Sequence, residues 1–197
     1  VLKRKKVDIQ TNTIATDIND EYVLVSIGVE GNSNGFGLNK IGVEIDENQH
    51  IKVDQSGKTN IDNIYAVGDV IGPPWLAHVS STEGLYVTEH IAKLYPKKID
   101  YDCVPACTYS KPEIGSIGLS QKTLDERGIN YKIAKSFFNA NGKAVASSST
   151  EGFIKILVSN DNHILGAHII GSNATEMISE FSLAMRNNLS VENILDT

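Results

Sequence analysis

The sequence predicts an α/β region followed by an α+β module. Two short, apolar and β-branched runs in the first half, at residues 22–28 and 64–67, have the composition of strands buried on both faces of a parallel sheet. In the second half, short strands alternate with helices, and the segment SNDNH suits a hairpin between two of the strands. The polar segment PKKID separates the two halves and predicts domains at 1–99 and 100–197.

Local patterns define the other elements of the first half. Alternating runs at 42–46 and 50–54 flank the segment ENQ and predict a hairpin. A helix is predicted at 76–94, because apolar residues recur there at mostly helical spacing and Pro96 ends the pattern. Gly84 lies inside this helix, where glycine costs about 1 kcal/mol relative to alanine unless another segment packs tightly against it.

The second half predicts five strands and two helices. The strands are expected at 104–109, 114–118, 131–138, 153–158 and 164–170. Ser120 begins a short helix that Gly128 ends. A final helix begins at Asn173, with Glu176 as its capping-box partner, and buries one apolar face. The residues of that face are Met177, Ile178, Phe181 and Met185.

Charge and hydropathy exclude several classes of function. The 197 residues include 18 basic and 24 acidic side chains, for a formal net charge of −6. This balance argues against a nucleic-acid or anionic-membrane surface as the main function. No apolar run is long enough to span a bilayer, and no signal peptide is visible, so we expect a cytoplasmic location and no membrane partner.

Cys103 and Cys107 are the two cysteines of the chain. One hypothesis is a redox pair or half of a metal site. The other is that both lie on one face of a strand, with Pro105 between them, as small apolar groups. No neighbouring glycine or helix start is present to lower a thiol pKa, so we favour the strand interpretation and predict no metal site.

Asp69 follows the second apolar run and precedes the predicted helix. The carboxyl ends of parallel strands are where open α/β sheets bind ligands. Gly68 allows a close backbone approach, Asp69 can accept hydrogen bonds from hydroxyl groups, and the free N–H groups of a helix start suit an anionic or carbonyl oxygen. The residues therefore predict a nucleotide or polyol at this point. The alternative is an aspartate that caps a backbone amide in a strand-to-helix loop.

Several independent segments carry a family resemblance. The segments IYAVGDV and WLAHVSSTEG are similar to the second flavin-contacting motif of the pyridine nucleotide–disulfide oxidoreductases. YVLVSIG resembles the strand that leaves the NAD-binding domain of that family, and VPACTYSKPEIGSIGLS resembles the start of its dimerisation domain. Within the family, FFNANGKAVA and EGFIKILVSNDNHILGAHIIGSNATEMISE are most similar to the branch that oxidises dihydrolipoamide.

The resemblance implies a cofactor site for FAD and NAD. Asp69 would hydrogen-bond the ribityl or pyrophosphate region of FAD, and Gly28 would lie near NAD. A short segment would pack beneath the isoalloxazine ring, with backbone amides near position 77 facing a ring carbonyl. Its residues are Trp75, Leu76, Ala77 and His78. For His78 a packing role is the alternative to a functional one.

Four motifs of the family are not found in this sequence. These are the glycine-rich turns for FAD and NAD, the C-x-x-x-x-C redox pair, and the His-Pro…Glu segment with the acid/base histidine. Cys103 and Cys107 have the wrong spacing for the redox pair, so no catalytic residue is assigned. The resemblance therefore implies remnants of the FAD- and NAD-binding parallel-sheet domains, followed by an α+β dimerisation domain that ends before its histidine segment.

Three functions remain open at this stage. The first is the C-terminal part of a flavin enzyme that oxidises dihydrolipoamide with NAD. This part would be inactive alone and would form a homodimer through 100–197. The intact protein would bind the lipoyl domains of 2-oxo acid dehydrogenase complexes. The second is a non-enzymatic product that retains only a dimerisation module. The third is another reductase of the same family, with a different disulfide or metal substrate.

Overall fold

The computed structural model describes residues 6–16 and 18–197, which divide into two units, 1–30 and 31–197. The described residues of the first unit form no helix or strand. Tyr22, Leu24 and Ile27 are 85%, 94% and 91% exposed. The predicted buried strand at 22–28 is therefore wrong, because a parallel strand needs hydrogen-bonded neighbours and no described residue pairs with it.

The start of the second unit consists of tight turns and short helices. The predicted hairpin at 42–54 is confirmed by an antiparallel bridge between Ile45 and Ile51. The predicted parallel strand at 64–67 is wrong. That segment pairs with the nearby residues 57–59, through an antiparallel bridge between Lys58 and Tyr65 and a 3.0 Å bond from Ala66 N to the Gly57 carbonyl. The short helices are η2 (Leu38–Ile41) and η3 (Gly68–Ile71).

Helix α1 (Ala77–Ile91) confirms the predicted helix, although it is three residues shorter at its C-terminal end. Its buried residues, Val79, Glu83 and Val87, recur every four positions and lie on one face. A Cβ atom added at Gly84 would meet nothing within 4 Å. No segment of the described chain therefore compensates for this glycine in the helix.

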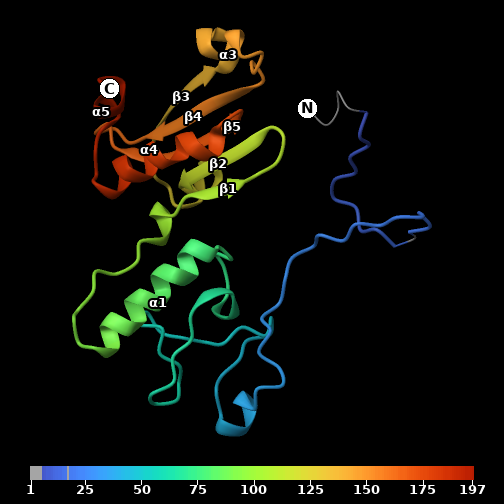
Figure 1. Cartoon of the computed structure of the whole chain (residues 1–197), viewed down its shortest axis with the longest axis vertical. Coiled ribbons are helices and arrows are strands. Elements are labelled where there is room, and N and C mark those ends of the chain that lie inside the picture. The colour runs from blue at the N-terminus through green and yellow to red at the C-terminus, as the bar shows by residue number, and fades with distance from the viewer. Residues whose placement is uncertain (1–5, 17) are drawn as a thin grey trace. The chain divides into compact units, whose positions relative to one another are not determined.

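The C-terminal part of the chain forms an antiparallel five-stranded sheet (Figure 1). The strands are β1 (Ala106–Thr108), β2 (Glu113–Gly118), β3 (Lys132–Phe137), β4 (Gly152–Val158) and β5 (Ile164–Gly171). Their order is β1-β2-β5-β4-β3, so β5 is central and β3 is an edge strand. All five predicted strands and the β4–β5 hairpin are confirmed, and the chain has a mixed α/β fold.

Helix α4 (Ala174–Arg186) packs against β2 and β5 and covers one face of the sheet. The buried core on this face includes Ile117, Ala167, Ile169, Ile178 and Phe181. Met177 and Met185 pack against this core and are partly buried. The remaining helices are η4 (Tyr101–Cys103), α2 (Gln121–Glu126), η5 (Phe138–Ala140), α3 (Gly142–Ala146) and α5 (Val191–Leu195).

Gly115 of β2 allows helix α4 to approach the sheet closely. A Cβ atom at this position would lie 2.5 Å from the Ala174 carbonyl oxygen and 3.1 Å from Ile178 Cβ. Real Cβ atoms do not approach backbone oxygen this closely. The close packing of β2 against the first turn of α4 therefore requires glycine, which has no side chain, at position 115.

The two predicted helix caps differ in outcome. Ser120 caps α2 as predicted, accepting a hydrogen bond from Thr123 N. Asn173 precedes α4 in a left-handed conformation and makes no side-chain cap, so the predicted capping box with Glu176 is wrong. Glu113 replaces it, because its Oε2 accepts from Thr175 N at 3.2 Å and from Thr175 Oγ1 at 2.8 Å. The carboxylate of a strand thus caps the helix that covers the sheet.

The two cysteines occupy different elements. Cys103 ends η4, and Cys107 lies in β1. The prediction that both residues belong to one strand is therefore wrong, since the chain turns through η4 before β1 begins. No helix within residues 6–16 and 18–197 is long and apolar enough to cross a membrane.

Candidate functional site

The candidate site is the loop that joins η3 to helix α1. Gly68 begins η3 with a φ of +78°, a conformation that favours glycine. A Cβ atom there would lie 3.0 Å from Ser80 Oγ. The absence of a side chain therefore allows the start of η3 to lie directly against the first turns of α1, with Asp69 immediately after the contact.

Glu83 fixes this contact and is 6% exposed. Its Oε2 accepts a hydrogen bond from Gly68 N at 2.7 Å, and its Oε1 accepts one from the Tyr101 hydroxyl at 2.8 Å. Burial, followed by the bond to Glu83, raises the pKa of Tyr101 to about 12. One carboxylate thus joins η3, α1 and the segment that leads into the C-terminal sheet.

Sequence reasoning missed Glu83, although a pattern pointed to it. Glu83 is spaced four residues from both Val79 and Val87, so it lies on the buried face of α1. A carboxylate in such a position must find hydrogen-bond donors, because burying an unpaired charge is costly. The pattern therefore indicates a polar contact between segments, although it does not identify the donors.

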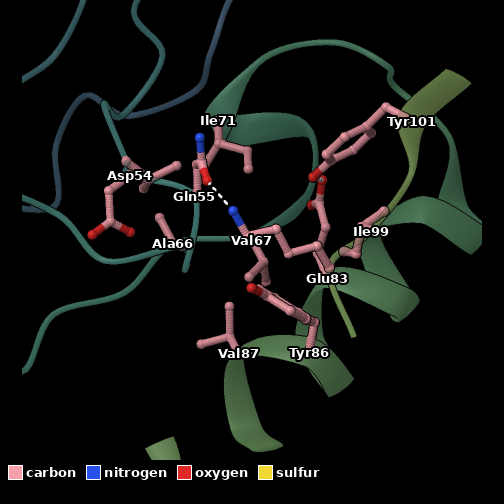
Figure 2. Close-up of a pocket in the computed structure, with 13 residues that line it drawn as sticks. Asp54, Gln55, Ala66, Val67, Ile71, Glu83, Tyr86, Val87, Ile99 and Tyr101 are labelled. Carbon is pink, nitrogen blue, oxygen red and sulfur yellow. Dashed lines mark hydrogen bonds between the residues drawn. The ribbon is translucent and has the colours of Figure 1, made fainter. Parts of the chain in front are cut away.

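A cavity of about 410 Å³ lies beside Glu83 (Figure 2). The side chains of Glu83 and Tyr101 meet at its wall, and Lys98 Nζ donates to Gln55 Oε1 at 2.6 Å, a bond between two other lining residues. Most of the other lining residues are apolar: Val53, Ala66, Val67, Ile71, Val87 and Ile99. Asp69 is not among the residues that line this cavity, so the cavity and the candidate site are adjacent but separate.

Asp69 lies on the surface of η3. Within the described residues its carboxylate accepts no hydrogen bond, and it does not cap a backbone amide. The structure therefore does not support the loop-capping alternative. An exposed carboxylate without a partner is available to hydroxyl groups of a ligand.

The predicted ring-contacting segment forms the start of α1. Trp75 is 40% exposed, and Leu76 is the half-buried N-cap residue. Ala77 and His78 are exposed, and their amides have no acceptor among the described residues. These amides belong to the first turn of a helix. The unbonded N–H groups of such a turn point outward from the N-terminal end of the helix and favour an oxygen ligand.

His78 also makes a structural contact. Its Nε2 lies 3.0 Å from the Pro105 carbonyl oxygen, just before β1. Since a carbonyl only accepts, Nε2 is the donor in this bond. The bond supports the packing role for the His78 side chain, while the backbone amide of the same residue stays free.

His50 and Asp46 form a second polar contact that sequence reasoning missed. His50 is 7% exposed, with Nδ1 3.2 Å from Asp46 Oδ2 and its ring centroid 6.3 Å from that of Trp75. The backbone amide of His50 donates to Asp46 Oδ1 and lowers the Asp46 pKa. The 42–54 hairpin thereby supports the loop that carries Trp75.

Gly28 belongs to the other unit of the chain. It is exposed, has a φ of +113°, and a Cβ atom there would meet nothing within 4 Å. Its conformation explains why glycine stands there.

The cysteines are held as thiols. Burial raises the pKa of Cys103 to about 11, and burial also raises the pKa of Cys107. Since the thiolate is the nucleophile and metal ligand, these environments disfavour both redox exchange and metal binding. No group of three or more potential metal-ligating side chains was found in the described parts of the chain.

Family comparisons give the wider context of these segments. Residues 2–84 match the family model described as pyridine nucleotide-disulphide oxidoreductase, and residues 104–197 match the dimerisation domain of the same family. The chain belongs to this family. The loop before α1 and the C-terminal sheet therefore lie in two segments that match two models of this one family.

Individual relatives agree with this assignment. A dihydrolipoyl dehydrogenase from Chlamydia muridarum is 43% identical over 178 residues, which is 90% of this chain and 38% of the relative. One from Bacillus subtilis is 46% identical over 165 residues, which is 83% of this chain and 35% of the relative. This chain thus spans less than two fifths of the length of these two relatives.

Solved structures show the same fold. LpdA from Mycobacterium tuberculosis has a TM-score of 0.78 at 25% identity, over 85% of this chain and 37% of that protein. The HOCl-induced flavoprotein disulfide reductase RclA from Escherichia coli has a TM-score of 0.72 at 24% identity, over 82% and 38%. The likeness to RclA concerns the fold alone.

Proposed function

We propose that this chain is the C-terminal part of a flavin-dependent disulfide oxidoreductase that oxidises dihydrolipoamide with NAD. The observation that carries the proposal is the identity of 43% to a dihydrolipoyl dehydrogenase over 90% of the chain. The geometry of the α1 loop supports it, because a carboxylate and two helix-start amides that have no partner among the described residues lie within one short segment.

The residues of this loop fit one edge of a bound FAD. Asp69 would accept hydrogen bonds from ribityl hydroxyls, and the amides of Ala77 and His78 would donate to a ring carbonyl. Trp75 and Leu76 would supply apolar contact to the ring. FAD supplies the hydride chemistry when it is bound, and the part of the protein described here positions it. Gly28 would contribute to the NAD site.

We also propose domains at 1–99 and 100–197, with a homodimer formed through the second. The match of residues 104–197 to a dimerisation domain supports this arrangement. The intact protein would act on lipoyl domains of 2-oxo acid dehydrogenase complexes in the cytoplasm. The name of the relatives supports that substrate class, since dihydrolipoyl groups are what such enzymes oxidise.

The chain alone should be inactive. It contains no C-x-x-x-x-C segment, and its two thiols have raised pKa values. We expect the purified chain to produce no NADH from dihydrolipoamide and NAD. NADH formation by this chain alone would contradict the assignment of inactivity.

A chimera tests the enzymatic assignment directly. The segments of the Bacillus subtilis relative that precede and follow the matched region are joined to this chain, and FAD retention after desalting is measured by absorbance. We expect the chimera to retain FAD and to oxidise dihydrolipoamide, and Asp69→Asn to weaken retention. Asp161→Asn, an exposed aspartate in the β4–β5 turn, is the matched control. A chimera that retains FAD but reduces only another disulfide or a metal ion would refute the proposal that dihydrolipoamide is the substrate.

A second candidate function is a dimerisation module without activity. The observation in its favour is that the buried core cluster lies wholly between β1 and α5 and uses no residue of the first hundred. This function predicts that the purified chain is a dimer in light scattering and retains no FAD. Retention of near-stoichiometric FAD by the unmodified chain would contradict it.

A further inference from the structure

The face of the sheet opposite α4 carries an unusual row of side chains. Successive residues of a strand point to opposite faces, so the register aligns side chains in rows across the sheet. Lys135 of β3 is paired with Lys155 of β4, and Lys155 is paired with His168 of β5. Two lysines therefore stand directly opposite each other on one face.

These two positive charges have no carboxylate partner in the described part of the chain. Like charges in direct cross-strand pairs destabilise a sheet. None of the ion pairs formed by the described residues includes Lys135 or Lys155. Lys155 Nζ donates to the neutral Gln121 Oε1 at 3.0 Å. Burial lowers the pKa of His168, so its ring is neutral at neutral pH and the charge of the row comes from the lysines.

Two aromatic rings lie in the next row. Phe137 and Phe153 are also direct cross-strand partners, with ring centroids 6.2 Å apart in an edge-to-face arrangement. Lys135 Nζ lies 3.8 Å from the Phe153 centroid and 4.8 Å from the Phe137 centroid. Phe137 is 52% exposed. We refer to Lys135, Phe137, Phe153 and Lys155 as the cationic face.

Strand β3 borders this face and is open along its outer edge. It is the last strand of the sheet, and all six of its residues are exposed. No described strand pairs with its outer edge. An edge strand with free N–H and C=O groups can accept an extended peptide as an additional strand.

We propose that the cationic face and the edge of β3 bind an extended acidic segment of a partner protein. The segment adds to β3 by backbone hydrogen bonds. A carboxylate of the added strand that lies in the row of Lys135 and Lys155 faces the two lysines, and Phe137 in the next row supplies apolar contact. Charge complementarity favours an acidic partner here, because two lysines without a carboxylate partner among the described residues lie side by side on this face, in a chain whose net charge is −6.

A peptide fits this surface better than a nucleic acid does. Proteins that bind nucleic acid through the backbone commonly neutralise about 6–10 phosphates, whereas the cationic face has two lysines. An extended peptide can use both the backbone edge and the charges. This inference does not rest on the proposed function, since it requires neither FAD nor the rest of the parent protein.

The test uses a fluorescein-labelled peptide in which glutamate alternates with threonine. Binding to the full chain is followed by fluorescence anisotropy at low salt. We expect Lys135→Gln with Lys155→Gln to weaken binding at least about tenfold, and about 1 M NaCl to abolish it, because salt at that concentration screens charges beyond about 3 Å. Lys132→Gln is the matched control, since Lys132 lies on the same strand and points to the other face.

Two further measurements decide the outcome. In the wild-type chain, the peptide should shift the amide NMR signals of β3 and β4, with no such shift from a peptide in which glutamine replaces glutamate. Equal binding of the two peptides, or equal binding by the double variant and the wild type, would overturn the proposal. Preferential binding of a single-stranded oligonucleotide through the same lysines would also overturn it, by assigning the surface to nucleic acid.

Discussion

Replacing Glu83 by leucine tests whether one buried carboxylate holds the candidate site together. The substitution keeps a similar volume and removes both acceptor oxygens. It leaves Gly68 N–H without its 2.7 Å bond and the Tyr101 hydroxyl without its 2.8 Å bond. Because Glu83 of α1 bonds both to η3 and to the segment at Tyr101, the loss affects all three segments.

The expected size follows from the two bonds. A hydrogen bond to a charged group contributes about 1.5–3 kcal/mol. The hydroxyl of Tyr101 regains water when the bond is lost, because this residue is 49% exposed, so its share is at the low end. We therefore expect Glu83→Leu to lower the free energy of unfolding by about 2–4 kcal/mol. Glu83→Gln should cost less, since an amide can accept from Gly68 and donate to Tyr101.

The chain provides its own probe for this experiment. Trp75 is the single tryptophan and lies just before α1. Urea unfolding followed by tryptophan fluorescence therefore reports on the region that Glu83 stabilises. A Tyr101→Phe variant removes one bond alone and completes a double-mutant cycle. If the leucine variant unfolds within about 0.5 kcal/mol of the wild type, the carboxylate does not hold these segments together.

Three other predictions concern glycine, thiol and phenol groups. Gly84→Ala should stabilise α1 by about 0.5–1 kcal/mol, since the site is open and helical. Gly115→Ala should lower the free energy of unfolding by about 1–3 kcal/mol, because the added Cβ atom clashes with α4. Thermal unfolding of both variants measures the contrast. Cys103 and Cys107 should react slowly with iodoacetamide at pH 8, and their labelling should become fast only in denaturant. Rapid labelling of the folded chain would contradict their raised pKa values. Tyr101 should ionise at about pH 12 in an ultraviolet titration. Its folded pKa is raised, so its contribution to stability is complete below pH 10 and is lost between about pH 10 and 12, and a normal titration near pH 10 would refute this.

The C-terminal module was predictable because its patterns are local. Each strand has its own alternating run and turn residues, and α2 has its own cap at Ser120. The pairing order was not predictable, since β2 pairs with β5 through a register that no neighbouring residues specify. The prediction of the α4 cap failed for the same reason, because the capping carboxylate of Glu113 comes from another element, β2.

The strand predictions for the first half failed because the formation of a parallel strand depends on partner strands that are distant in the sequence. The runs at 22–28 and 64–67 have the residues of buried parallel strands, and strand formation requires neighbouring strands to pair with. No described residue supplies a parallel neighbour, so one run is exposed and the other pairs with the turn before it. For the candidate site, the sequence predicted that Asp69 precedes a helix start, and in the structure Asp69 lies in η3, shortly before α1. The roles of Glu83 and His50 depend on contacts between segments.

The central position of β5 has a consequence for synthesis on the ribosome. Ile117 of β2 packs in a core whose other members come from β5 and α4, yet β5 ends only at Gly171. At about 5–20 residues per second, the interval between finishing β2 and finishing β5 lasts about 3–10 s. During that time β1 and β2 form at most an isolated hairpin, which is marginally stable in water. The strand that joins the two halves of the sheet is the last to be made, so nascent chains that stop before it expose apolar strands and become clients for chaperones or proteases.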